Sequence, residues 1–283
     1  MPPASAWHPL VERALCEDLS AGDLTSSLVI PAGAEAVARI EAREALTVCG
    51  IDVVLEVFRQ VDPELHCEAL HRDGDRVDAD AVLLRLRGPL RAILAGERTA
   101  LNFLARLCGI ASQAARFVAA VSGTRAKVVD TRKTLPGWRV LDKYAVTTGG
   151  AYNHRSGLFD GILLKDNHIA GGGGLEAVVK SALTDAPAGM RVQVEIQSEA
   201  EAELALNSGA DFLLIDNCSP EEVRRLVERF GDRALLEASG SIDLANVRSY
   251  ADTGVQRISS GALTHSVVGS DLALEIDSGG VVR

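Results

Sequence analysis

Residues Val192–Ser241 read VQVEIQSEAEAELALNSGADFLLIDNCSPEEVRRLVERFGDRALLEASGS. Three short apolar runs recur in this stretch, at Val192–Ile196, Phe212–Asp216 and Ala234–Ala238. Short apolar runs are typical of strands that are buried on both faces of a parallel sheet. The segments between them carry helix-start signals, S-E-A-E from residue 198 and S-P-E-E from residue 219, the second with proline at the first helical position. This alternation of strand and helix predicts parallel βα units.

The same rhythm continues on both sides of this stretch, from about residue 123 onward. Further strands are expected at Ala126–Asp130, Gly161–Lys165 and Arg257–Ser260. The preceding segment, Pro89–Val121, has a helical apolar period and no proline after its start, which predicts one long helix or two helices broken at Gly109.

Residues 8–108 mix helical and strand patterns instead of alternating them. Helices are expected at Leu10–Leu19 and Ile51–Val61, and strands at Val37–Arg43, Glu64–Leu70 and Ala81–Leu86. Such a mixture predicts a small α+β domain with an antiparallel sheet.

The composition excludes several classes of protein. The 283 residues carry a net charge of −10, which disfavours general binding to nucleic acid or to an anionic membrane. Five cysteines without a C-x-x-C motif indicate reduced thiols in a cytoplasmic protein, not a disulfide framework or a zinc site. The opening residues, MPPASAWHPL, lack the pattern of a secretory signal, and no run of 18 apolar residues predicts a membrane span.

The charge is unevenly distributed. The window Arg125–His168 holds eight Lys or Arg against four Asp, a net charge of +4 within an acidic chain. A pocket for a small polyanion is the interpretation we favour. A solvated basic face is the alternative, because surface ion pairing is the usual role of a single Lys or Arg.

Nearly every strand predicted after residue 123 ends in a polar residue. In a βα barrel the active site lies at the carboxyl ends of the strands, so these side chains should converge. Helix N-caps are an alternative explanation for the aspartate and serines, but they do not explain a lysine or a glutamate. The strand-end residues are Asp130, Lys165, Glu195, Asp216, Ser239 and Ser260.

Further candidate ligand-binding groups lie close to these strand ends. Thr131-Arg132-Lys133 follows the first strand, and His154-Arg155 precedes the second. Arginine offers a bidentate fork to carboxylates, and lysine offers a point charge to phosphates. Small turns at Ser239-Gly240-Ser241 and Ser260-Gly261-Ala262 would let backbone N–H groups approach an anion.

Metal binding is a separate question. His154 and His168 are spaced unlike the ligands of any zinc site. Glu195 and Asp216 form a plausible carboxylate pair, which could bind Mg²⁺ together with substrate phosphates, hold sugar hydroxyls, or stabilise developing positive charge.

Several segments together resemble the quinolinate phosphoribosyltransferase family, also called carboxylating nicotinate-nucleotide pyrophosphorylase. The resemblance covers residues 10–275 and is most specific where DTRKTLPG, NHR and LLKDNH follow one another. The other segments that carry it are EDLSAGDLTS from residue 17, ERTALNFL from residue 97, LLIDN from residue 213, EASGS from residue 237 and SSGALTHS from residue 259.

The resemblance implies a fold and a reaction. The fold would be α/β: an incomplete seven-stranded βα (TIM-like) barrel at residues 111–264, plus an N-terminal α/β sandwich domain at residues 1–110, rejoined by residues 265–283. The reaction would convert quinolinate and phosphoribosyl pyrophosphate into nicotinate mononucleotide, pyrophosphate and CO₂ for NAD synthesis, with Mg²⁺ as cofactor. The family also implies a homodimer, or a hexamer, in which Arg98 reaches the neighbouring active site.

Site residues follow from the matching motifs. Lys133, Lys165, Glu195 and Asp216 would be catalytic, and Glu195 and Asp216 would also hold the metal. The serine and glycine turns would bind the 5′-phosphate. The complete substrate-binding set would be Arg98, Thr131, Arg132, Lys133, His154, Arg155, Lys165, Glu195, Asp216, Ser239, Gly240, Ser241, Ser260, Gly261 and Ala262.

Three alternatives remain open at this point. A paralogue encoded with molybdate transport shares the fold but lacks the K-D-N-H run found at residues 165–168. A barrel lyase would use Lys133 or Lys165 as a Schiff base. A sensor would bind the ligand without turnover. The chain also departs from the family pattern at Trp138, Ala151, Tyr152 and Ser241. None of these departures removes a charged residue, so they are expected to change the shape of loops more than the activity.

Overall fold

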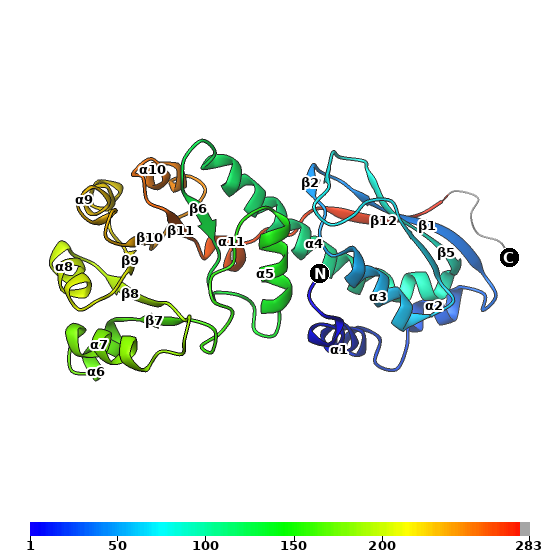
Figure 1. Cartoon of the computed structure of the whole chain (residues 1–283). Coiled ribbons are helices and arrows are strands. Elements are labelled where there is room, and N and C mark those ends of the chain that lie inside the picture. Colours follow the sequence, from blue (N-terminus) through cyan, green and yellow to red (C-terminus); the bar gives the residue numbers. More distant parts are fainter. Residues whose placement is uncertain (278–283) are drawn as a thin grey trace. The chain divides into compact units, whose positions relative to one another are not determined.

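The computed structural model describes residues 1–277, and the chain forms two compact units within it (Figure 1). The first unit contains residues 1–115, 135–150 and the described residues from 267 onward. The second contains residues 116–134 and 151–266. The last six residues of the expected C-terminal return, 278–283, lie outside the described residues.

The first unit is built on an antiparallel sheet in the order β12-β1-β5-β3. The C-terminal strand β12 pairs with β1 in the register Ala38↔Ile276, so residues from both ends of the chain share one sheet. The strands are β1 (Glu35–Ala42), β3 (His66–Ala69), β5 (Val82–Pro89) and β12 (Leu272–Ile276), with a separate ribbon of β2 (Leu46–Thr47) and β4 (Arg76–Val77).

Helices complete this unit, and the two helices expected in residues 8–108 are confirmed. The helices are α1 (His8–Leu19), α2 (Leu24–Val29), α3 (Ile51–Val61), α4 (Leu90–Ala120, in this unit up to Ala115) and α5 (Arg139–Thr148), with a short 3₁₀ turn at Ala4–Ala6.

The long helix α4 continues through Gly109 without a break. A Cβ at this position would collide with the carbonyl oxygen of Val268 and would lie 3.0 Å from Val267 Cγ1. Glycine is therefore explained by the close approach of the returning C-terminal segment, and not by a helix end.

The segment Leu135–Gly150, which the sequence assigned to the barrel, packs in the first unit. The Trp138 ring stacks on Phe103 with centroids 4.6 Å apart. The buried Asp142 carboxylate accepts from both Arg106 Nε (2.9 Å) and Nη2 (2.7 Å). These contacts fix helix α5 to the residues of α4.

The second unit contains a six-stranded parallel sheet in the order β6-β11-β10-β9-β8-β7. Helices lie along its outer side (Figure 1), as βα units require. The strands are β6 (Lys127–Val129), β7 (Ile162–Leu164), β8 (Val192–Ile196), β9 (Phe212–Asp216), β10 (Leu235–Ser239) and β11 (Arg257–Ser259). The helices are α6 (Asp166–Gly171), α7 (Leu175–Asp185), α8 (Glu199–Asn207), α9 (Pro220–Phe230), α10 (Val247–Ala251) and α11 (Ala262–His265).

The partial barrel is confirmed, but the expectation of seven strands was one too many for the described residues. The seventh position is reduced to a single parallel bridge between Val129 and Tyr152. The chain then runs as a loop to β7, and β6 and β7 do not pair with each other.

The helix-start signals in the quoted stretch are confirmed in detail. Ser219 caps α9 by accepting from Glu222 N–H, and the Glu222 carboxylate accepts from Ser219 N–H at 2.8 Å. Ser198 caps α8 by accepting from Glu201 N–H, but the Glu201 carboxylate accepts from Gln197 N–H and not from Ser198, so the reciprocal half of the expected capping box is absent there. None of the helices in residues 1–277 combines the length and the apolar character that a membrane span needs.

Candidate active site

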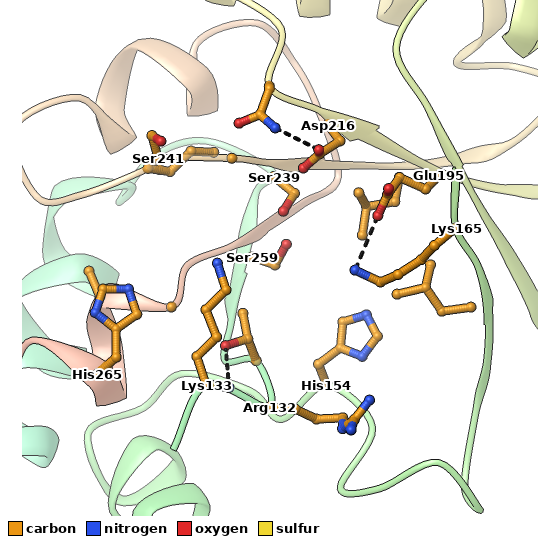
Figure 2. A pocket seen from close by; sticks show the side chains of 18 of the residues that line it. Arg132, Lys133, His154, Lys165, Glu195, Asp216, Ser239, Ser241, Ser259 and His265 are labelled. Atoms are coloured by element: carbon orange, nitrogen blue, oxygen red, sulfur yellow. Dashed lines mark hydrogen bonds and ion pairs between the residues drawn. The ribbon is translucent and has the colours of Figure 1, made fainter. Parts of the chain in front are cut away.

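A cavity of about 820 Å³ lies at the carboxyl ends of the strands of the second unit. Figure 2 shows basic, acidic and hydroxyl side chains from several strands converging on it. The predicted residues that line it are Thr131, Arg132, Lys133, His154, Arg155, Lys165, Glu195, Asp216, Ser239, Gly240, Ser241, Gly261 and Ala262.

Two of the predicted site residues do not line the cavity. Arg98 lies on α4 in the first unit. Ser260 is 1% exposed; its hydroxyl donates to the carbonyl of Ile242 at 2.5 Å and accepts from Ala262 N–H at 3.2 Å. The preceding residue, Ser259, faces the cavity instead, because alternate strand residues face opposite sides.

Several residues that line the cavity were not predicted from the sequence. Leu163 and Leu214 stand two residues before Lys165 and Asp216, so the period of two along each strand could have identified them. The remaining ones are Ser259, the last residue of β11, and residues of the turns and helix ends that follow the strands. They are Asp166, Asn217, Ile242, Asp243, Ser259, His265 and Ser266.

The arginines of the cavity are close enough to affect one another. Burial lowers the pKa of Arg155, and the neighbouring Arg132 guanidinium lowers it further. Arg155 Nη1 donates to the carbonyl of Gly161 at 3.0 Å, which orients the guanidinium. Two adjacent cations repel each other, so an anion bound between them would be favoured.

The backbone of Lys133 is held by two hydrogen bonds at the edge of the cavity. Its N–H donates to Thr131 Oγ1 at 3.0 Å, and its carbonyl accepts from the Thr264 hydroxyl at 2.9 Å. The side chain extends into the cavity between Ser259 and His265 in Figure 2. Gly261 makes room for this stem, because a Cβ there would lie 2.8 Å from Lys133 Cδ.

The acidic side of the cavity is formed by Glu195 and Asp216. Lys165 Nζ lies 3.3 Å from Glu195 Oε2, and the Glu195 side chain is only 11% exposed. Asp216 Oδ2 accepts from Asn217 Nδ2 at 2.6 Å. Both carboxylates can therefore face a positively charged group in the cavity.

The same two carboxylates are suited to Mg²⁺. Within residues 1–277 no three His, Cys, Asp or Glu side chains gather into a metal-binding group. Mg²⁺ is commonly held by one or two carboxylates together with substrate phosphates and water, so two carboxylates that line one cavity fit this mode. His168 is not part of it: its Nδ1 accepts from Lys165 N–H at 3.0 Å at the start of α6.

Turns with unusual backbone geometry close the cavity after β9 and β10. Gly240 has φ +101°, and a Cβ there would lie 2.6 Å from the Asn217 backbone nitrogen. Ser241, one of the departures from the family pattern, adopts φ 50°. Gly240 and Ser241 line the cavity in the turn that follows a late strand, which is the usual place of a phosphate site in barrels.

Comparison with protein families agrees with this geometry over nearly the whole chain. Residues 23–108 match the quinolinate phosphoribosyl transferase N-terminal domain, and residues 110–275 match the C-terminal domain.

Individual relatives give the same result. A probable nicotinate-nucleotide pyrophosphorylase [carboxylating] of Bacillus subtilis is 39% identical over 94% of this chain and 92% of its own length. The nicotinate-nucleotide pyrophosphorylase [carboxylating] of Mycobacterium leprae is also 39% identical, over 96% and 97%. The solved structure of the nicotinate-nucleotide pyrophosphorylase from Francisella tularensis superposes with a TM-score of 0.91 at 37% identity, covering 98% of both chains. The chain belongs to the quinolinate phosphoribosyl transferase family.

Proposed function

We propose that the chain transfers a phosphoribosyl group to quinolinate and releases CO₂, giving nicotinate mononucleotide and pyrophosphate. The observation that carries this proposal is one cavity that is lined by four Lys and Arg side chains together with the carboxylates of Glu195 and Asp216. The matched family and the names of the relatives support the same activity.

The cationic side accounts for substrate binding. Quinolinate carries two adjacent carboxylates, and guanidinium groups bind such pairs in a bidentate manner. Arg132 and Arg155 are the arginines that line the cavity, and burial together with the neighbouring Arg132 lowers the pKa of Arg155. Lys133 and Lys165 supply point charges for the pyrophosphate.

The acidic side accounts for ribosyl transfer. The pyridine nitrogen attacks C1 of the ribose as the bond to the pyrophosphate oxygen breaks, and the ribose acquires oxocarbenium character. Glu195 and Asp216 can stabilise that developing positive charge. Lys165, paired with Glu195, keeps the carboxylate oriented. When bound at these carboxylates, Mg²⁺ would neutralise charge on the substrate phosphates.

Decarboxylation follows from the product of this transfer. Alkylation makes the ring nitrogen positive, so the adjacent carboxylate can leave as CO₂, with its bonding electrons stabilised by the pyridinium. The ring carbon is then protonated. The protein need only hold the ring in place and exclude competing reactions.

The turns after β10 and β11 are suited to the 5′-phosphate. Gly240–Ser241 and Gly261–Ala262 line the cavity with small residues. The net charge of −10 argues against a nucleic-acid partner, and the five free cysteines agree with a cytoplasmic location. We further propose a homodimer in which Arg98 completes the neighbouring site.

The test is to incubate the protein with carboxyl-labelled quinolinate, phosphoribosyl pyrophosphate and Mg²⁺, and to measure CO₂ and nucleotide together. Equal amounts of CO₂ and nicotinate mononucleotide are expected. Nicotinate, which lacks the second carboxylate, should be a poor substrate in the same assay. Binding of quinolinate without CO₂ would support a sensor, and efficient turnover of nicotinate would contradict the proposal. Borohydride trapping of substrate on a lysine would support the Schiff-base alternative.

A further inference from the structure

A second layer of polar side chains lies beneath the cavity. Glu195 on β8 and Ser239 on β10 line the cavity, and the residues two positions earlier, Gln193 and Glu237, point to the same side of these strands. Gln193 is 2% exposed and Glu237 is fully buried. Buried polar groups in otherwise apolar strands are costly unless they make hydrogen bonds, so their contacts indicate their purpose.

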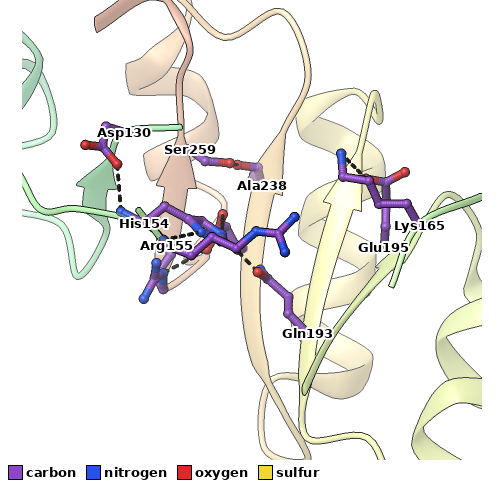
Figure 3. Close-up of polar contacts among 10 residues, drawn as sticks. Asp130, His154, Arg155, Lys165, Gln193, Glu195, Ala238 and Ser259 are labelled. Carbon is purple, nitrogen blue, oxygen red and sulfur yellow. Dashed lines mark hydrogen bonds and ion pairs between the residues drawn. The ribbon is translucent and has the colours of Figure 1, made fainter. Parts of the chain in front are cut away.

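Both side chains meet the imidazole of His154. Figure 3 shows Gln193 bonded to this ring, and Gln193 Oε1 lies 2.9 Å from His154 Nε2. Glu237 Oε1 lies 3.4 Å from the same nitrogen. The other Glu237 oxygen accepts from Arg257 Nε at 2.8 Å, which fixes the carboxylate from behind.

The opposite side of the ring defines its tautomer. The backbone N–H of Arg155 points at His154 Nδ1, with 2.7 Å between the nitrogens. A backbone N–H can only donate, so Nδ1 must carry a lone pair and the ring proton must be on Nε2. That proton is donated to Gln193 Oε1, while Glu237 Oε1 lies 3.4 Å from the same nitrogen without a hydrogen bond.

These contacts hold the backbone of Arg155 in place. Asp130 Oδ1 accepts from His154 N–H at 2.7 Å, and the His154 ring accepts from the next N–H along the chain. The Arg155 guanidinium is bonded to Gly161 O at 3.0 Å. The position of the Arg155 backbone therefore depends on the orientation of the His154 ring.

We propose that Gln193 and Glu237 are positioning residues for Arg155, and that they act by holding His154 in its Nε2–H tautomer. His154 then supports the arginine with both ring nitrogens, and neither nitrogen serves as the ligand of a substrate carboxylate. This inference rests on the proposed function only in identifying quinolinate as the ligand of Arg155.

The tautomer can be measured on the wild-type protein without substrate. Ring-¹⁵N labelling of the six histidines, with the His154 signals assigned by their loss in His154→Gln, reports which nitrogen carries the proton. Protonated Nε2 and unprotonated Nδ1 are expected near pH 7.5. A proton on Nδ1, or rapid averaging between the two tautomers, would overturn the inference.

The positioning role is tested with Gln193→Met, which keeps the size of the side chain and removes the acceptor. The KM for quinolinate should rise by about 10-fold, because a small displacement of a binding group weakens the contacts that depend on it. The KM for phosphoribosyl pyrophosphate should change less than about 2-fold, since Arg155 does not bind that substrate in this scheme. The His154 signals should shift toward averaging.

Gln256→Met is the matched control. Gln256 directly precedes β11 of the same sheet, and its Oε1 accepts from Leu236 N–H at 3.0 Å. It should lower the melting temperature yet leave the quinolinate KM and the His154 spectrum unchanged. A quinolinate KM that rises equally in both variants would show a structural effect alone and overturn the positioning role.

The outcomes separate the two proposals. A wild-type protein that does not turn over quinolinate contradicts the proposed function, while the spectrum still decides the tautomer. Turnover with an unchanged KM in Gln193→Met contradicts the positioning role alone. If Gln193→Met does not fold, the wild-type spectrum remains decisive.

Discussion

The guanidinium of Arg155 combines partial burial, a neighbouring cation and a backbone anchor. Arg155→Lys keeps the charge but removes the planar fork, so the quinolinate KM should rise by about 10-fold or more, with a smaller effect on kcat. Steady-state kinetics with each substrate varied in turn would measure this. Arg191→Lys is the control, because Arg191 is a half-exposed partner of Asp211 and should tolerate the change. An unchanged quinolinate KM in Arg155→Lys would remove Arg155 from the quinolinate site.

Gly240 combines a positive φ of +101° with a backbone contact that leaves no space for a side chain. Gly240→Ala should therefore cost more than about 2 kcal/mol of unfolding free energy, from backbone strain and steric overlap together. Gly123→Ala is the matched control, with φ +80° and nothing within 4 Å of an added Cβ, and should show only strain of about 1 kcal/mol. Urea unfolding of both variants measures the difference. Equal losses of unfolding free energy in the two variants would mean that the backbone at Asn217 moves aside without cost.

Among the elements, helix α3 carries a carboxylate that should make stability depend on pH. Glu56 accepts from Arg59 Nε at 2.6 Å and from Gln60 Nε2 at 2.7 Å, although only 6% of the residue is exposed. Hydrogen bonding from Arg59 lowers the pKa of Glu56, and the bond from Gln60 adds to this. The lowered pKa contributes stability above the unfolded pKa of glutamate, and this stability is lost as pH falls through the folded value.

Glu56→Gln should accordingly lower the melting temperature at pH 7 and reduce its decline as the pH is lowered through the acidic range. Thermal unfolding at several pH values below 7 would show this. Glu176→Gln is the control, because its partner Lys180 is exposed and surface pairs contribute little. Parallel pH profiles for wild type and Glu56→Gln would contradict the prediction.

At the scale of the whole molecule, the placement of Arg98 outside the described cavity bears on assembly. Arg98→Ala and Lys133→Ala should each be inactive as pure proteins. When they are mixed and allowed to exchange subunits, about one quarter of wild-type activity should return, because half of the dimers are mixed and each has one intact site. Each variant mixed with wild type under the same conditions controls for exchange. Failure to regain activity despite exchange would argue against a shared site.

Much of this architecture could be predicted from local pattern. The strands of the second unit, the Ser219 cap and the convergence of Lys165, Glu195 and Asp216 all follow from period and position along the chain. Contacts between distant segments could not be predicted this way. Gly109 in α4 is required by the close approach of residues near 268, and residues 135–150 belong to the first unit because of their contacts with α4. Hydrophobic periodicity gives no signal for either contact.

The buried polar layer was missed for a different reason. The polar residues at the strand ends predict the cavity, but Gln193 and Glu237 lie in the middle of apolar runs. A polar side chain inside a strand buried on both faces is itself the signal, since it must be satisfied by a partner. Extending the period of two inward from each strand end would have identified both.

The bridge between Val129 and Tyr152 stands in place of a seventh strand. A complete barrel has no edges, whereas within residues 1–277 this sheet ends at β7, which pairs with β8 alone. The residues that follow Tyr152 are not part of a strand, so the chain can turn there. Both His154 and Arg155 then reach the cavity, whereas in a strand successive side chains would point to opposite faces. The barrel is therefore left open at this side. The amides on the unpaired edge of β7 should exchange with deuterium sooner than the amides of β9, which is paired on both sides.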